Sequence, residues 1–299
     1  MDRKIFYMGM LLLVTFFWGV TFPVVKVALG YIGPGPFLAL RFLAATIMMA
    51  FFVRRGKGFL SPTNIKHGMV AGFLLFIGYY FQTVGLEYTS AAASGIITGA
   101  YVVILPLMSY LYLKTKVSRV DLFSSIIAFG GLILMSIGSL SNLGTELGDL
   151  LTLICAVGYA LQIAYVSKHS RNINSSTFTF YQIAAVTIFS TISIPFTPGG
   201  LGSVNLYVAF AIIFTAIFGS VFGYYVSTVA LIYVEPTAAG IIFVAEPIFA
   251  ALAAVVLAHE HLGIYVILGG AVMIMAMFLT SLDKYLKGRR VTSLNNNGA

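Results

Sequence analysis

The chain has 299 residues, of which 60% are hydrophobic and only 9% are charged, and its mean hydropathy is +0.99. A water-soluble globular domain needs more polar surface than this composition supplies, which excludes that class of protein and predicts that the bilayer is the solvent. The formal net charge is +8, but the basic residues fall in short loops between apolar runs and form no solvated basic face, which excludes a nucleic-acid-binding protein.

The sequence divides into ten apolar runs. The first extends from Ile5 to Leu29, after the charged start Met1 to Lys4. It is longer than the roughly 7 to 15 residues of a signal-peptide core and no soluble domain follows it, so we interpret it as an uncleaved transmembrane helix. About 20 apolar residues suffice to cross a bilayer. The runs predict an all-α membrane protein with ten transmembrane helices at residues 5–29, 34–53, 67–86, 91–113, 120–138, 147–166, 177–196, 207–233, 238–257 and 263–282.

Lysine and arginine predict the orientation, because short cytoplasmic loops retain them. With the N-terminus in the cytoplasm, fifteen of the seventeen basic residues fall in cytoplasmic segments, and the other two, Lys26 and Arg41, lie within helices. The loops on the opposite side contain none. Both termini are therefore predicted to be cytoplasmic, and the polar residues 288–299 are predicted to form a disordered cytoplasmic tail.

An internal repeat relates the two halves of the chain. A shift of 145 residues aligns residues 73–97 with 218–242 at twelve of twenty-five identical positions, and a shift of 141 aligns 37–47 with 178–188. Each half then holds five predicted helices. Because five is odd, the second half must cross the membrane in the opposite direction, which predicts two inverted five-helix repeats. In secondary transporters of this architecture the substrate site lies near the membrane midplane where the repeats meet.

Three stretches carry a family resemblance. They are Trp18-Gly19 with Phe22 and Lys26, Leu40 to Ala44, and Glu246 to Leu252 followed by Glu260 and Leu262. These stretches resemble the EamA-type transporters of the drug/metabolite transporter (DMT) superfamily, although residues 259–262 read His-Glu-His-Leu where that family has Gly-Glu-Arg-Leu. The resemblance implies two EamA-like repeats, at residues 1–140 and 141–287, in a prokaryotic inner (plasma) membrane. It also implies transport of small metabolites, commonly the export of amino acids, with nucleotide sugars and sugar phosphates as alternatives.

Lys26, Arg41 and Glu246 are candidates because ionisable groups within a membrane helix usually face a cavity or a partner, and Glu246 is the leading one. It lies eight residues into its helix, about 12 Å along it and close to mid-bilayer. Pro247 follows and cannot donate a hydrogen bond to the carbonyl of Phe243, which leaves a polar acceptor beside the carboxylate. Glu246 is predicted to bind a substrate amine or to exchange a proton; the alternative is a structural carboxylate. The repeat assigns Tyr101 to the equivalent position.

Arg41 and Lys26 are the two cations within predicted helices. Arg41, which aligns with Gln182 in the second half, is a candidate for holding a substrate carboxylate in bidentate fashion. A structural role, with the side chain reaching helix-end carbonyls, is the alternative. Lys26 lies nearer a helix end and reaches the membrane surface more easily. It too is a candidate for substrate binding, with a structural role as the alternative.

Aromatic and amide side chains complete the predicted substrate-binding set. Rings can stack on an apolar ligand or surround an ammonium group, and they can equally serve as packing or interface residues. Mid-span glutamines can bind a substrate or pair across helices. The candidates are Trp18, Tyr79, Tyr80, Gln82, Tyr101, Tyr159, Gln162, Tyr224 and Tyr225.

Motifs for enzymatic or metal chemistry are missing from the sequence. There is no Walker A sequence and no GxSxG, the turn His259-Glu260-His261 lacks HExxH spacing, and the single cysteine, Cys155, cannot form an intramolecular disulfide. We predict no enzyme activity, no cofactor, no metal and no obligate protein partner. The predicted function is a secondary transporter for efflux of amino acids or related metabolites by alternating access, with a proton as candidate co-substrate. A nucleotide-sugar or sugar-phosphate carrier is the main alternative, ahead of a membrane enzyme or a channel.

Overall fold

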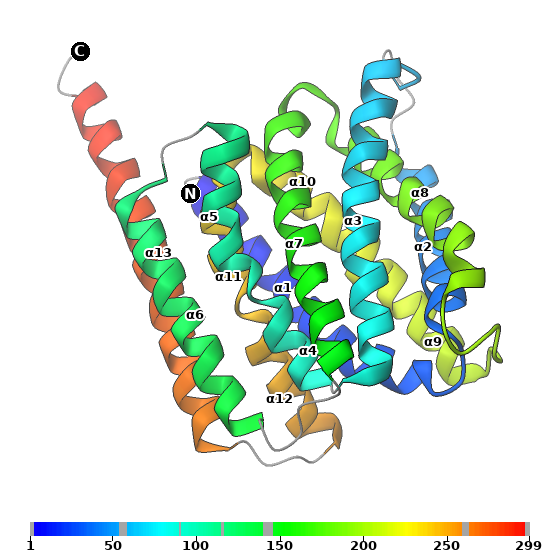
Figure 1. Ribbon diagram of the computed structural model, residues 1–299. Coiled ribbons are helices and arrows are strands. Elements are labelled where there is room, and N and C mark those ends of the chain that lie inside the picture. Colours follow the sequence, from blue (N-terminus) through cyan, green and yellow to red (C-terminus); the bar gives the residue numbers. More distant parts are fainter. Residues whose placement is uncertain are drawn as a thin grey trace.

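The computed structural model describes residues 3–53, 59–89, 91–114, 117–139, 146–258 and 263–296. Over this part of the chain the structure is helical and contains no strand (Figure 1). The helices in chain order are α1 (Arg3–Leu29), α2 (Pro34–Phe52), α3 (Pro62–Tyr88), α4 (Ala91–Thr98), α5 (Tyr101–Leu113), α6 (Arg119–Ser139), α7 (Glu146–His169), η2 (Ser170–Asn172), α8 (Ser175–Ser193), η3 (Ile194–Phe196), α9 (Leu206–Phe214), η4 (Thr215–Phe222), α10 (Gly223–Tyr233), α11 (Pro236–Phe243), α12 (Glu246–Ala258) and α13 (Ile264–Asn296).

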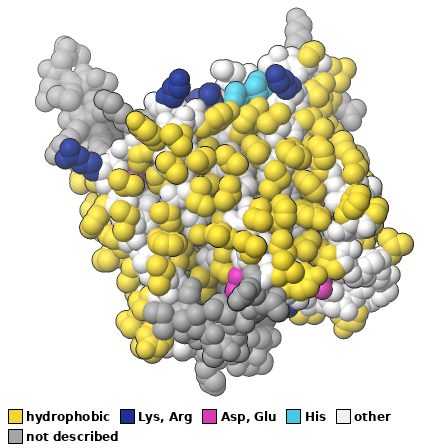
Figure 2. Space-filling view, viewed as in Figure 1, with side chains coloured by type: hydrophobic (Ala, Val, Ile, Leu, Met, Phe, Trp, Pro, Cys, Tyr) yellow, Lys and Arg dark blue, Asp and Glu magenta, His cyan; other side chains and the backbone are white. Residues whose placement is uncertain are grey.

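The surface and the helix lengths are those of a membrane protein. Eight helical segments of the described chain are long and apolar enough to cross a membrane, and a shorter apolar helix covers Ile267–Asp283. Phe51 and Leu206 are 83% and 89% exposed, which is unfavourable in water and ordinary against lipid. Figure 2 shows hydrophobic side chains over the visible face, with most of the visible Lys and Arg at the end that holds both chain termini. The protein is therefore an all-α multi-pass membrane protein.

The eight long segments fall on eight of the ten predicted spans. The fifth and tenth predicted spans fall on α6 and α13, which pack against each other. Helix α13 continues to Asn296, so the backbone is helical over residues 288–296, where the sequence predicts a disordered tail. No proline interrupts this stretch, and a helix that has already formed adds residues at little cost. Residues 297–299 lie outside the described part of the chain.

Two of the predicted spans are broken in the middle, at equivalent positions of the repeat. The fourth span is interrupted between α4 and α5, at Gly99 and Ala100, and the ninth between α11 and α12, at Val244 and Ala245. These two breaks are 145 residues apart. At the second break Pro247 has no N–H to donate to the carbonyl of Phe243, so the helix cannot continue regularly. At the first break a valine takes the place of the proline: the N–H of Val102 bonds the carbonyl of Gly99, three residues back, at 3.1 Å.

Equivalent residues of the two repeats contact each other at the centre of the bundle. The Tyr224 hydroxyl donates a hydrogen bond to that of Tyr79, 145 residues earlier, at 2.9 Å. The hydroxyls of Thr46 and Thr187, 141 residues apart, also lie 2.9 Å apart. In Figure 1, α3 runs from the upper to the lower end, whereas its equivalent, α9 to α10, runs from the lower to the upper end. Both features are expected of a twofold axis in the membrane plane.

A π-helical segment, η4, connects α9 to α10 beside this axis. Such segments leave carbonyl groups free to bond outside the helix and often occur at functional sites. Here the carbonyl of Gly219 accepts a hydrogen bond from the indole Nε1 of Trp18 at 2.9 Å. A Cβ at Gly223 would lie 2.6 Å from the same indole nitrogen, so glycine is what lets α1 and Trp18 approach this closely.

Candidate functional site

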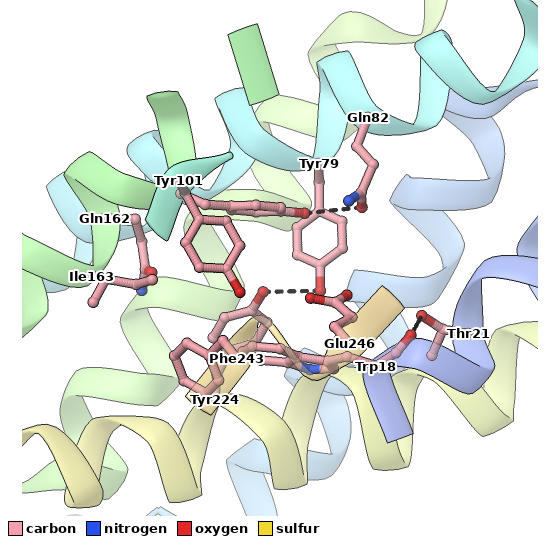
Figure 3. A pocket seen from close by; sticks show the side chains of 11 residues that line it. Trp18, Thr21, Tyr79, Gln82, Tyr101, Gln162, Ile163, Tyr224, Phe243 and Glu246 are labelled. Carbon is pink, nitrogen blue, oxygen red and sulfur yellow. Dashed lines mark hydrogen bonds between the residues drawn. The ribbon is translucent and has the colours of Figure 1, made fainter. Parts of the chain in front are cut away.

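A cavity lies at the centre of the bundle, where helices of both repeats meet (Figure 3). The space in it that no atom fills is about 440 Å³, including the part that is open to solvent. Its walls come from α1, α3, α5, α7, α10 and the α11–α12 pair, which are the first, third, fourth, sixth, eighth and ninth predicted spans. The lining residues are Trp18, Thr21, Tyr79, Gln82, Tyr101, Tyr159, Gln162, Ile163, Tyr224, Phe243 and Glu246.

Glu246 supplies the negative charge of this cavity. It is the first residue of α12, directly after the helix break, and its side chain is buried. Helix α1 packs so tightly against the break that Gly19 has no room for a side chain: a Cβ added there would lie 2.7 Å from the Glu246 carbonyl oxygen. Within the described part of the chain, no hydrogen bond or ion pair holds the carboxylate. A buried carboxylate with its lone pairs free is costly unless a ligand or water satisfies it.

Aromatic rings surround the carboxylate. Figure 3 shows the hydroxyl groups of Tyr79, Tyr101 and Tyr224 pointing into the same central space as Glu246. The ring of Trp18 lies 5.4 Å from that of Tyr224, and that of Tyr79 lies 5.6 Å from that of Tyr159, measured between centroids. The Tyr101 hydroxyl is buried and has no hydrogen-bond partner among the described residues. The site therefore combines one carboxylate, π-faces and an unused hydroxyl.

Eight of the eleven cavity-lining residues form four pairs that the repeat relates. Tyr79 and Tyr224, and likewise Tyr101 and Glu246, are 145 residues apart. Two further pairs are 141 residues apart: Trp18 with Tyr159, and Thr21 with Gln162. Equivalent positions of both repeats therefore build the cavity, and Tyr101 at the position equivalent to Glu246 is its largest chemical asymmetry.

Two amide side chains at the cavity wall differ in their surroundings. Gln82 is held from both sides: its Nε2 donates to the Thr98 hydroxyl and its Oε1 accepts from the Tyr159 hydroxyl, both at 3.1 Å. The dashed line to Gln82 in Figure 3 is the second of these bonds. Gln162 lies on α7, about one helical turn beyond Tyr159.

Arg41 does not line the cavity. Its side chain is 2% exposed and lies behind Tyr79, where Nε donates to the Ser220 hydroxyl and Nη2 to the Tyr79 hydroxyl, each at 3.1 Å. The guanidinium carbon also lies 4.7 Å from the centroid of the Tyr79 ring and 5.1 Å from that of Phe42. The structural alternative for Arg41 therefore fits its position: it fixes the Tyr79 hydroxyl and is not itself among the residues that line the cavity.

Three other predicted residues also lie away from the cavity. The ammonium group of Lys26 donates to the carbonyl oxygens of Leu86 and Thr89 at the end of α3, as helix-end lysines often do. Tyr80 donates from its hydroxyl to the Phe196 carbonyl at 3.3 Å, and Tyr225 is 42% exposed. Adjacent residues of a helix point about 100° apart, so only one tyrosine of each Tyr-Tyr pair can face inward.

Sequence reasoning missed three lining residues: Thr21, Ile163 and Phe243. Each lies three or four positions from a residue that it identified, namely Trp18, Tyr159 and Glu246. Side chains at this spacing on one helix share a face, so helical periodicity could have found Thr21 and Ile163. Phe243 and Glu246 lie on either side of the break between α11 and α12, so periodicity does not relate these two.

A metal centre finds no support among the described residues, where no group of three or more His, Cys, Asp or Glu could hold an ion. The turn at His259 to His261 lies outside the described part of the chain.

The sequence matches one family of membrane proteins twice. Residues 5–137 and 146–282 each match the EamA-like transporter family. The chain belongs to this family. The EamA domain is thus present once in each half of the chain, as the sequence resemblance indicates, and the protein is a membrane transporter and not an enzyme.

Relatives of this EamA protein are transporters without an assigned substrate. An uncharacterized transporter of Archaeoglobus fulgidus is 34% identical over 272 residues, which cover 91% of this chain and 84% of that protein. The uncharacterized transporter YyaM of Bacillus subtilis is 28% identical over 72% of this chain and 74% of its own length. A protein of known crystal structure aligns with a TM-score of 0.77 at 15% identity, over 94% of this chain and 97% of its own, and shares the fold.

Proposed function

We propose that this protein is a secondary carrier that moves a small metabolite bearing an amino group by alternating access. Amino acids and related amines are the first candidates, in the direction of efflux, and Glu246 is the residue that binds the amino group. The observation that carries the proposal is a buried, unpartnered carboxylate enclosed by the rings of Trp18, Tyr79, Tyr101, Tyr159, Tyr224 and Phe243. Such rings stabilise an ammonium group through their π-faces while the carboxylate supplies the counter-charge.

The proposed architecture is ten membrane crossings in two inverted repeats, with both termini in the cytoplasm of a plasma or inner membrane. The charge distribution of the loops supports this orientation, since Lys and Arg concentrate on the side of the termini. The equivalent contacts on the axis support the inversion. Two half-structures of this kind can exchange roles between inward-open and outward-open states.

Glu246 also suits proton exchange, because the carboxylate must be ionised to hold an ammonium group and can be protonated when the site is empty. Coupling of this kind would let a proton gradient drive substrate out of the cell. Without coupling, a carrier only equilibrates its substrate.

The alternative carrier function, for nucleotide sugars or sugar phosphates, receives less support from the site. Such substrates need several cationic donors. Of the two Lys and Arg residues within the predicted spans, Arg41 bonds Tyr79 and Ser220, and Lys26 bonds the end of α3. The amino-acid proposal is affected as well: Arg41 cannot receive the substrate carboxylate where it lies, so the amino group alone is matched.

The test is counter-flow in proteoliposomes loaded with an unlabelled solute, using labelled amino acids, the amines derived from them and nucleotide sugars. We expect exchange of at least one amino-group-bearing solute and none of the nucleotide sugars. Glu246→Gln should abolish the exchange, while Glu235→Gln, which alters a half-exposed ion pair with Lys4 at the surface, should preserve it. Exchange of a nucleotide sugar that survives Glu246→Gln would overturn the proposal.

A further inference from the structure

A line of polar side chains connects the cavity to the end of the molecule opposite the chain termini. It consists of four contacts, each joining α7 to α3, α4 or the turn between them, and we call it the polar ladder. From that end toward the cavity, the contacts are Thr89 Oγ1 to Asp149 Oδ1 at 2.8 Å, Ser94 Oγ to Thr152 Oγ1 at 3.5 Å, Thr98 Oγ1 to Cys155 Sγ at 3.8 Å, and Tyr159 OH to Gln82 Oε1 at 3.1 Å.

The side chains in the middle of the ladder are buried, and their contacts across the helix interface are long. Ser94, Thr98, Thr152 and Cys155 are at most 1% exposed. Their contacts of 3.5 and 3.8 Å lie at the long limit for hydrogen bonds of their kinds. Hydroxyl groups both donate and accept, so a water molecule inserted between such groups keeps every partner satisfied.

The outer end of the ladder is charged and reachable by solvent. Asp149 is partly exposed. Next to it, the ammonium group of Lys26 donates a hydrogen bond to the backbone carbonyl oxygen of Thr89, with a distance of 3.1 Å between the two atoms. The inner end reaches the wall of the cavity at Tyr159 and Gln82. The ladder thus spans the distance between the solvent at one end of the protein and the space around Glu246.

In the other half of the protein, the interface equivalent to the first three ladder contacts is apolar. Under the shifts of 141 and 145 residues, the equivalents of Asp149, Thr152 and Cys155 are Met8, Leu11 and Val14, and those of Thr89, Ser94 and Thr98 are Val234, Ala239 and Phe243. These six side chains are all buried, five of them in one hydrophobic cluster. Since this interface packs without polar contacts, helix packing alone does not require the ladder.

We propose that the polar ladder is the route by which water and protons reach Glu246 from the end of the protein that holds Asp149, while the apolar interface keeps the opposite end dry. The inference rests on the proposed exchange of protons at Glu246. A proton taken up at Asp149 passes along hydroxyl groups and intervening water and ends on the carboxylate, which lacks the charge that pairs with an ammonium group while it is protonated. The titratable groups on the surrounding helices that interact electrostatically with Glu246 are Tyr79, Tyr101, Cys155, Tyr159 and Tyr224.

Cys155, the single cysteine of the chain, reports directly on water in the ladder. In X-ray radiolytic footprinting, hydroxyl radicals formed from nearby water oxidise side chains, and mass spectrometry measures the rate. We expect Cys155 to be oxidised although it is buried, and the rate to fall several-fold in Thr152→Val, which removes a ladder hydroxyl at almost constant volume. Thr228→Val is the matched control, because Thr228 accepts a hydrogen bond from Thr179 between two other helices. An unoxidised Cys155, or an equal rate in Thr152→Val, would overturn the route.

Proton movement is measured with a pH-sensitive dye inside proteoliposomes, beside substrate counter-flow at equal pH. Thr152→Val should slow substrate-linked proton movement several-fold and leave counter-flow unchanged, and Thr228→Val should change neither. A parallel loss of both activities in Thr152→Val would assign the ladder a purely structural role. If wild type exchanges substrate without moving protons, the proposed coupling is wrong and the proton half of the inference falls with it, while oxidation of Cys155 still decides the water route.

Discussion

The contact of α4 with α7 and the contact of α11 with α1 are equivalent by the internal repeat, yet one is polar and the other apolar. Ser94 faces Thr152 in the first, whereas Ala239 and Leu11 take the equivalent positions in the second. Each interface includes the half-helix that precedes a break, α4 in one and α11 in the other, and each ends at the cavity. The repeat therefore duplicates the backbone, and individual substitutions give each half its own chemistry.

The same difference recurs at single positions on the axis. Glu246 lies opposite Tyr101, and Arg41 is equivalent to Gln182. Gln182 is fully buried and its side-chain amide has no hydrogen-bond partner among the described residues, whereas Arg41 holds Tyr79 and Ser220. Two halves that pack alike can therefore differ in which of them binds a substrate, admits water or stays closed.

Among the variants that test the difference between the two interfaces, Phe243→Thr should have the largest effect, because it gives the apolar interface the residue type found at Thr98. Phe243 is 1% exposed and packs 5.1 Å from the Trp18 ring, so we expect a loss of about 3 kcal/mol in the free energy of unfolding. We also expect a substrate-independent proton leak, since the ring separates the cavity from the dry end. Unfolding in detergent and dye-loaded proteoliposomes measure the two effects.

Phe178→Thr is the matched control for that variant. Phe178 is equally buried in the same hydrophobic cluster but does not line the cavity. It should lose comparable stability without a leak. A leak in both variants, or in neither, would mean that the apolar interface is not the seal.

Arg41→Gln gives the first repeat the residue type found at the equivalent position of the second repeat, Gln182, and should have an intermediate effect. Removing hydrogen bonds from a charged donor to Tyr79 and Ser220 should lower the free energy of unfolding by roughly 1.5 to 3 kcal/mol. Because Arg41 does not line the cavity, the order of preference among cationic, zwitterionic and anionic solutes in counter-flow should not change. A reversal of that order would show that the guanidinium reaches the substrate after all.

Thr46→Val should have the smallest effect, because it tests a contact at which the repeats remain alike. Thr46 and Thr187 bond each other across the axis, and hydrogen bonds between helices in membranes contribute about 0.6 kcal/mol. A double-mutant cycle with Thr187→Val measures the coupling free energy. A value indistinguishable from zero would argue against direct contact of these equivalent residues on the axis.

The sequence predicts the helices and the family well, because both depend on local signals. Long apolar runs identify membrane helices wherever they lie, and the repeat is visible in Gly-Tyr-Tyr at residues 78–80 and 223–225. The breaks in the fourth and ninth spans are harder to predict. Pro247 indicates one of them. The equivalent residue at the other is Val102, and only the fold reveals that its N–H bonds the carbonyl of Gly99, three residues back, and so departs from the regular helix.

Eight of the twelve predicted site residues line the cavity, and the other four show what the sequence cannot specify. A charged residue within a predicted membrane helix is expected to have a specific role, but the sequence does not show which groups it contacts. Arg41 and Lys26 are both buried cations by that criterion, and both find protein partners that come from distant parts of the chain. Which tyrosine of each adjacent pair faces inward depends on the rotation of its helix, which packing determines.

The most direct test of the central claim uses Trp18, the only tryptophan, which lines the cavity beside Glu246. Purified protein is titrated with amino acids, the corresponding amines and nucleotide sugars while the Trp18 emission is recorded, in wild type and in Glu246→Gln. We predict a saturable change with an amino-group-bearing solute, and a roughly 10- to 100-fold weaker affinity in the variant, as expected for the loss of a charged hydrogen bond. A saturable response to a nucleotide sugar but to no amine, or equal affinity in the two proteins, would contradict the account.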